Sequence, residues 1–122
     1  MELTKAEEQI MQLIWDHEPM YFKDIMEQMP APIPATTTVA TLLKRMTDKG
    51  FISYELHGNS RQYHSLVSKD AYFKDHVGNL VNNFFGKSAL EFASFFTQQV
   101  KMSKQELEEL RKMIDQKLKD KK

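Results

Sequence analysis

The sequence predicts a mainly α-helical (α+β) fold in two parts, a compact domain over residues 1–70 and a helical arm over residues 71–122. Three observations predict this. Apolar residues recur at helical spacing in three N-terminal segments. Two short runs rich in β-forming residues then flank a cluster of turn-forming residues at 57–61. After residue 67 the pattern is helical to the end of the chain.

The N-terminal helices are expected at about residues 5–17, 21–29 and 36–49. Thr4-Lys5-Ala6-Glu7 has the form of a capping box at the start of the first helix, whose apolar stripe includes Ala6 and Ile10. Three prolines within residues 30–34 separate the second and third helices, because proline lacks an N–H and fixes φ. The third helix ends before Gly50, which suits a C-cap. Its apolar stripe is Val39, Leu42, Leu43 and Met46.

The β-forming runs at residues 51–56 and 62–67 predict a hairpin around the turn at 57–61. Three helices followed by a hairpin describe a winged helix-turn-helix domain. The five elements are expected to share one small core.

The C-terminal arm is expected to contain three helices, at about 68–85, 88–100 and from residue 103 onward. Ser103-Lys104-Gln105-Glu106 is a second capping box. These helices carry more apolar surface than they can bury by themselves, which predicts a partner chain, most simply in a homodimer. The expected interface residues are Leu80, Phe84, Phe85, Phe92, Phe95, Phe96, Leu107, Leu110 and Ile114.

Composition excludes several classes of function. The 122 residues contain no Cys, which removes disulfides, thiol nucleophiles and Cys-ligated metal. No apolar run approaches the roughly 18 residues of a membrane span, and the polar N-terminus lacks the apolar region of a signal peptide, so a cytoplasmic protein is expected. The four His residues show no metal-ligand spacing, and no Gly-rich phosphate loop occurs. We therefore expect no metal, no cofactor and no enzymatic activity.

The net charge gives no indication of a nucleic-acid partner, because 17 basic residues balance 17 acidic ones and residues 1–70 carry a net charge of −3. Residues 36–61, however, are net +2. In a helix-turn-helix the second helix of the pair, here the one at 36–49, enters the major groove of DNA. The residues suited to base edges are Thr37, Thr38, Thr41 and Arg45, and those suited to phosphates are Lys44, Lys49, Asn59 and Arg61.

Simpler interpretations of the same residues remain open. A polar helix face is often only solvated, and Thr36 and Thr37 can serve as helix caps after Pro34. The Phe-rich helices can form a core, a dimer interface or a pocket for a small molecule.

Several segments resemble the penicillinase repressor (BlaI/MecI/CopY) family. They are Leu3 to Met11 with Ile14-Trp15, Thr37 to Met46 with Lys49 to Ile52, Gln62-Tyr63, Phe84-Phe85-Gly86, and Leu107 to Arg111. Together they cover nearly the whole chain. The resemblance implies a bacterial homodimeric transcriptional repressor that binds a palindromic operator as double-stranded DNA. It also implies, as a candidate partner, the membrane sensor-protease pathway that leads to cleavage of β-lactam-responsive members in the arm.

The chain departs from the family pattern at three places. The copper-responsive branch has a Cys-rich tail, which is absent here. The Asn-Phe bond cut in β-lactam-responsive members corresponds to Phe95-Phe96, whereas Asn83-Phe84 lies too early. Ala40 stands where resistance repressors can carry Arg, which predicts a different operator. Two alternative functions stay open: a winged-helix module for protein–protein interaction, and a regulator that responds to a small molecule.

Overall fold

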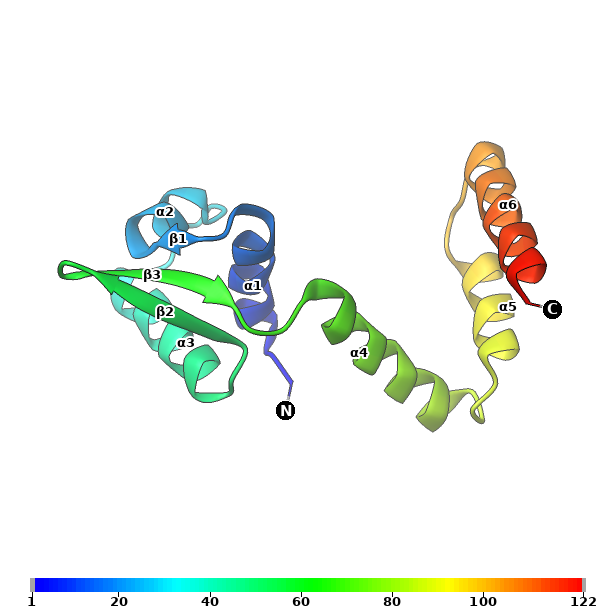
Figure 1. Cartoon of the computed structure of the whole chain (residues 1–122), viewed down its shortest axis with the longest axis horizontal. Helices are drawn as coiled ribbons and strands as arrows, with labels where there is room; N and C mark the ends of the chain where they lie inside the picture. The colour runs from blue at the N-terminus through cyan, green and yellow to red at the C-terminus, as the bar shows by residue number, and fades with distance from the viewer. Residues whose placement is uncertain (1, 122) are drawn as a thin grey trace. The chain divides into compact units, whose positions relative to one another are not determined.

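The computed structural model describes residues 2–121 and contains two compact units, Met1–Asp75 and His76–Lys122. Figure 1 shows the order of the elements along the chain. The first unit contains α1 (Lys5–His17), β1 (Met20–Tyr21), α2 (Phe22–Gln28), α3 (Thr36–Asp48), β2 (Ile52–His57), β3 (Ser60–Ser65) and the start of α4 (Lys69–Phe84). The second contains the rest of α4, α5 (Ala89–Gln99) and α6 (Lys104–Asp120). The predicted mainly helical α+β class is confirmed.

The predicted capping box at the start of α1 is confirmed. The Thr4 hydroxyl accepts a hydrogen bond from the Glu7 N–H at 3.2 Å, and the Thr4 N–H donates to Glu7 Oε1 at 2.8 Å. The expected apolar stripe was wrong at Ala6, which is exposed, whereas Glu7 is completely buried. A charged residue therefore lies inside the first unit.

Strand β1 was not predicted. It has only two residues, too few to show an alternating pattern, and it occupies the start of the segment expected as the second helix. Met20 pairs with Tyr63 and Tyr21 with Gln62, so the antiparallel sheet has the order β1-β3-β2. β1 therefore fixes the start of α2 beside the hairpin.

The hairpin, or wing, has a tighter turn than the sequence predicted. His57 pairs with Ser60, so the loop is only Gly58-Asn59, and the expected turn at 57–61 was too long. Gly58 has φ +66°, a left-handed conformation that glycine adopts readily. As a result, Ser60 and Arg61 are strand residues, and the pairing of β3 with β2 sets the direction of their side chains.

The core of the first unit lies between the three helices and the sheet. The predicted stripe on α3 is confirmed, because Val39, Leu43 and Met46 are fully buried and Leu42 is partly buried. The other buried apolar residues are Leu3, Ile10, Met11, Ile14, Met20, Ile25, Met29, Phe51, Ile52, Tyr63 and Tyr72.

The first turn of α4 packs on α1 through Tyr72. The Tyr72 hydroxyl donates to Glu8 Oε2 at 2.9 Å, and its ring lies 5.7 Å from that of Trp15 and 5.8 Å from that of Phe51. The Trp15 indole N–H donates to the Val67 carbonyl at 2.9 Å. The beginning of α4 therefore belongs to the core of the first unit.

The second unit has little interior of its own. None of its described residues, His76–Lys121, is buried. The Phe85 ring lies 5.5 Å from each of the rings of Phe92 and Phe95, which forms a small aromatic cluster. The predicted capping box of Ser103 and Glu106 is confirmed at the start of α6. Among the described residues, no helix is both long and apolar enough to cross a membrane.

Candidate nucleic-acid interface

Helix α3 presents one apolar and one polar face. While its apolar stripe enters the core, Thr37, Thr38, Thr41, Lys44 and Arg45 are all exposed. The structure therefore brings the predicted base-contacting residues together on one outward-facing surface of a single helix.

The threonines at the start of α3 do not cap it. The N-cap is Ala35, which has no side-chain oxygen, and its carbonyl accepts from the Thr38 N–H at 3.0 Å. The interpretation of Thr36 as a cap was therefore wrong. Further along, the Thr41 hydroxyl donates to the Thr37 carbonyl at 2.9 Å. This bond uses the only hydrogen-bond donor of the Thr41 side chain. Thr41 therefore exposes a methyl group and an acceptor oxygen.

Two lysines of this region are engaged with acidic residues. Lys44 Nζ lies 3.0 Å from Asp48 Oδ2 in an exposed i,i+4 pair, which is worth little and is readily exchanged for another anion. Lys49 Nζ instead contacts Glu7 Oε1 at 2.6 Å and the Glu2 carbonyl at 3.2 Å. The phosphate contact expected for Lys49 stays a prediction.

The Glu7–Lys49 pair joins the start of α1 to the end of α3. Burial by itself raises the pKa of Glu7, but the hydrogen bond from Lys49 and the bond from the Thr4 backbone together hold that pKa below its usual value. The second carboxylate oxygen, Oε2, is buried without a hydrogen-bond partner. The charge of Glu7 therefore depends on Lys49.

Arg61 is held on the surface of the wing by aromatic residues. Its guanidinium carbon lies 4.5 Å from the centroid of the Tyr54 ring, within the range of a cation–π interaction. Tyr54 is paired across the sheet with Tyr63, at 5.6 Å between ring centroids. An interaction with the Tyr63 side chain is the main cause that raises the pKa of Arg61. The interaction therefore favours the charged form of the Arg61 side chain.

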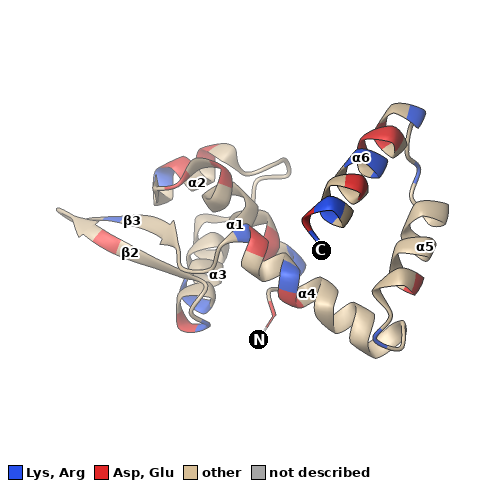
Figure 2. Ribbon diagram, turned by 45° about the vertical axis from the view of Figure 1, so that its right-hand side comes forward, with Lys and Arg blue, Asp and Glu red and all other residues tan. Residues whose placement is uncertain are grey.

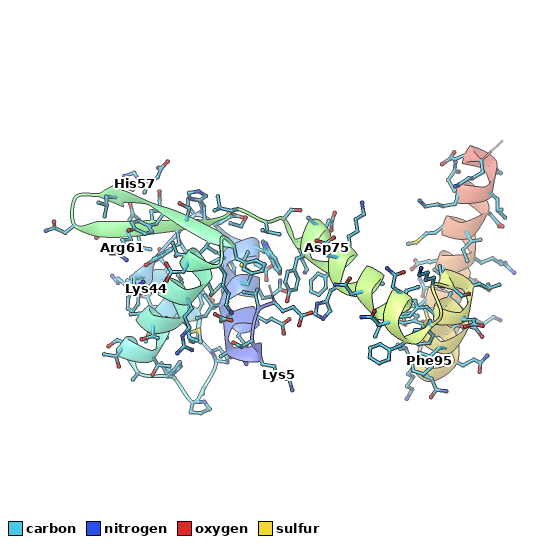
Figure 3. The ribbon with its side chains drawn as sticks, turned by 90° about the horizontal axis from the view of Figure 1, so that it is seen from below. Lys5, Lys44, His57, Arg61, Asp75 and Phe95 are labelled. Atoms are coloured by element: carbon cyan, nitrogen blue, oxygen red, sulfur yellow. The ribbon has the colours of Figure 1, made fainter. Side chains whose placement is uncertain are left out.

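A groove of about 450 Å³ lies where α2, α3 and the wing meet; we call it the wing groove. Its lining residues are Tyr21, Phe22, Lys23, Ala40, Asn59, Ser60, Arg61 and Tyr63. Figure 3 shows Arg61 and Lys44 on the same side of the first unit, and Lys5 far from both. Predicted residues from the wing therefore adjoin α3. Lys23 was missed by sequence reasoning, although a basic residue in the first helix of a helix-turn-helix pair is a usable signal.

The predicted interface residues of the second unit remain accessible. Phe84, Phe95, Leu107 and Ile114 are exposed, as are Leu80 and Phe96, while Phe85, Phe92 and Leu110 are half-buried. Figure 2 shows that α5 carries almost no charge; Glu91 is its one ionisable residue. One face of α6 forms a groove lined by the apolar residues Leu110, Met113, Ile114 and Leu118, together with Lys117 and Lys121. Within residues 2–121, no group of three His, Asp or Glu side chains is placed to hold a metal ion.

Three packed helices and a wing, with an exposed polar face on the third helix, define a winged-helix protein with a helical C-terminal region. The chain belongs to the penicillinase repressor family, whose model matches residues 3–116. The family consists of transcriptional repressors, which confirms the prediction of a non-enzymatic regulator.

Relatives of known function match along most of the chain. The chain is 26% identical over 117 residues to the methicillin resistance regulatory protein MecI of Staphylococcus aureus, a match that covers 95% of each chain. It is 20% identical over 116 residues to the penicillinase repressor of Bacillus licheniformis, covering 94% of this chain and 91% of that protein.

Solved structures show the same fold. The DNA-binding domain of the repressor BlaI matches with a TM-score of 0.53 and 21% identity, over 58% of this chain and 88% of that domain. MepR, a transcription regulator of the Staphylococcus aureus multidrug efflux pump MepA, matches with a TM-score of 0.50 and 15% identity, over 99% of this chain and 82% of MepR.

Proposed function

We propose that this chain is a transcriptional repressor that acts as a homodimer on a palindromic DNA operator. The observation that carries the proposal is the outward face of α3, where Thr37, Thr38, Thr41 and Arg45 stand together above a buried apolar stripe. Membership of the penicillinase repressor family and the names of the relatives support it. A bacterial repressor of this family that binds DNA would act in the cytoplasm.

Base recognition is assigned to the exposed threonines, principally Thr38 and Thr41, with Thr37 and Arg45 beside them. The Thr41 methyl group suits a thymine methyl, and its hydroxyl oxygen suits an amino group of adenine or cytosine. Arg45 suits the two acceptors of guanine. These contacts would distinguish one operator sequence from another.

Backbone contact is assigned to Lys44, Asn59 and Arg61. Such contacts fix the position of the protein on DNA without reading sequence. Lys44 would leave its weak pair with Asp48 for a phosphate, and Arg61 would contact the backbone from the wing. Lys49 is less suited to this role, because its departure would leave the Glu7 carboxylate buried and unpaired.

Dimerisation is assigned to the second unit. Its predicted interface residues are apolar and accessible, and a two-fold interface would use the same surface on both copies. Two α3 helices related by such an axis would match a palindromic operator. A sensor-protease pathway remains a prediction from the family resemblance.

The proposed homodimer is tested with two variants of α6 that each add one negative charge. Leu110→Glu changes the apolar face, whereas Gln105→Glu changes the polar face beside Lys104 and Lys112. Sedimentation velocity should show a dimer for the wild type and for Gln105→Glu, and a monomer for Leu110→Glu. Wild-type protein should select an inverted repeat from a pool of random duplexes.

The outcomes separate the alternatives. Selection of single half-sites by a monomeric wild type would contradict the homodimer. Failure to enrich any duplex, even at low salt, would contradict DNA binding and favour a winged-helix module for protein contacts.

A further inference from the structure

The wing groove combines positive charge with hydrogen-bond donors. Lys23 comes from α2, Asn59 and Arg61 come from the wing, and the side chains of Asn59 and Ser60 add an amide and a hydroxyl. The lining contains no carboxylate. A groove of this composition suits an anion with several acceptor oxygens.

The two cations of the groove have no acidic partner. Among residues 2–121, the ion pairs of Lys side chains use Lys44 and Lys49, and neither Lys23 nor Arg61 pairs with a carboxylate. Lys23 is exposed, and Arg61 is directed by the Tyr54 ring. Both charges are therefore available to an anion from outside the chain.

The neighbouring acidic residues Asp24 and Glu55 do not enter the groove. Asp24 follows Lys23, but its Oδ2 accepts from the Tyr21 N–H at 3.0 Å and so caps the start of α2. On the wing, Glu55 Oε2 lies 3.7 Å from His57 Nε2. Neither carboxylate lines the groove.

The groove adjoins the recognition face of α3 through Ala40. The small side chain of Ala40 lies between the threonines at positions 38 and 41 in sequence and lines the groove itself. A long side chain at this position would occupy the space. A DNA strand that places bases against α3 would therefore bring its sugar-phosphate backbone towards an open, cationic groove.

We propose that the wing groove binds a phosphate of the DNA backbone, and that Lys23 is a positioning residue which, with Arg61, holds this phosphate beside α3. The inference rests on the proposed DNA-binding function. The contact reads no base. It fixes how far α3 enters the major groove, and so determines which bases the exposed threonines reach.

The test compares Lys23→Gln with Lys5→Gln, which removes the same charge from an exposed position far from the wing. Affinity for the selected operator and for random DNA is measured over a salt series. The slope of log K against log[salt] for the operator should fall in magnitude by about 1.8 in Lys23→Gln, as expected for one lost phosphate contact from each protomer of the dimer, and stay unchanged in Lys5→Gln. Equal slopes in wild type and Lys23→Gln would overturn the inference.

A second measurement locates the phosphate. Operator duplexes carry one neutral methylphosphonate at each backbone position in turn. One position in each half-site, at symmetry-related places, should weaken wild-type binding and have no further effect on Lys23→Gln. If every position weakens both proteins equally, the inference is overturned while DNA binding stands; if wild type binds no duplex, the proposed function itself fails.

Discussion

The ion pair between Glu7 and Lys49 gives the most quantitative prediction, which concerns Lys49→Met. The Glu7 side chain is completely buried, and its Oε2 already lacks a hydrogen-bond partner. Removing Lys49 leaves the buried Glu7 carboxylate with the Thr4 N–H, at 2.8 Å, as its one remaining hydrogen-bond donor. Breaking one side of a buried pair costs about 3–5 kcal/mol, and we expect about 3 kcal/mol because the Lys49 side chain is 23% exposed.

The assay is urea unfolding at one fixed protein concentration, applied to a double-mutant cycle. Glu7→Gln keeps an acceptor for the Thr4 N–H and removes the charge. The double variant Glu7→Gln/Lys49→Met should be more stable than Lys49→Met alone, because no charge is left buried. Additivity of the two single changes to within about 0.5 kcal/mol would refute the coupling.

The same pair predicts a pH dependence with a definite sign. The folded pKa of Glu7 lies below its unfolded value of 4.5, so the ionised carboxylate stabilises the fold. This stabilisation is fully present above pH 4.5 and is lost as the pH falls through the folded pKa. Glu7→Gln should lack this part of the acid destabilisation, and an identical loss in wild type and Glu7→Gln would contradict it.

Two further predictions concern the start of α4 and the face of α3. Tyr72→Phe removes the hydrogen bond to the Glu8 carboxylate while keeping the ring contacts, and should lower the free energy of unfolding by about 1.5 kcal/mol; no change in the urea midpoint would show that the bond contributes nothing. Thr41→Ala should lose about 1 kcal/mol of affinity for the operator and none for random DNA, measured by mobility shift; equal losses on both DNAs would exclude Thr41 from base recognition.

Local sequence patterns predicted the helices of both units well. The stripe of α3 and the capping boxes at Thr4 and Ser103 depend on residues three or four apart, so they are visible in a single sequence. Strand β1 was not predicted because it consists of Met20 and Tyr21 alone and forms through its pairing with β3.

Contacts between residues far apart in the sequence were not predicted, because they too depend on how separate elements pack together. Glu7 was expected to lie outside the apolar stripe, and its bond to Lys49, 42 residues away, adds to the local bond from Thr4 in stabilising a buried carboxylate there. Lys23 was not singled out because its neighbours in the wing groove come from α3 and the hairpin. The candidate residues on α3, by contrast, follow from helical spacing within one segment.

The central claim is sequence-specific DNA binding by the face of α3 and the wing. A salt-titrated mobility shift tests it most directly, with the DNA immediately upstream of the protein's own gene and random DNA of equal length as the control. We predict tight, salt-sensitive binding that prefers the upstream DNA and yields a footprint with two-fold symmetry. Weak and equal binding to both DNAs, together with failure to enrich any duplex from a random pool, would contradict the account.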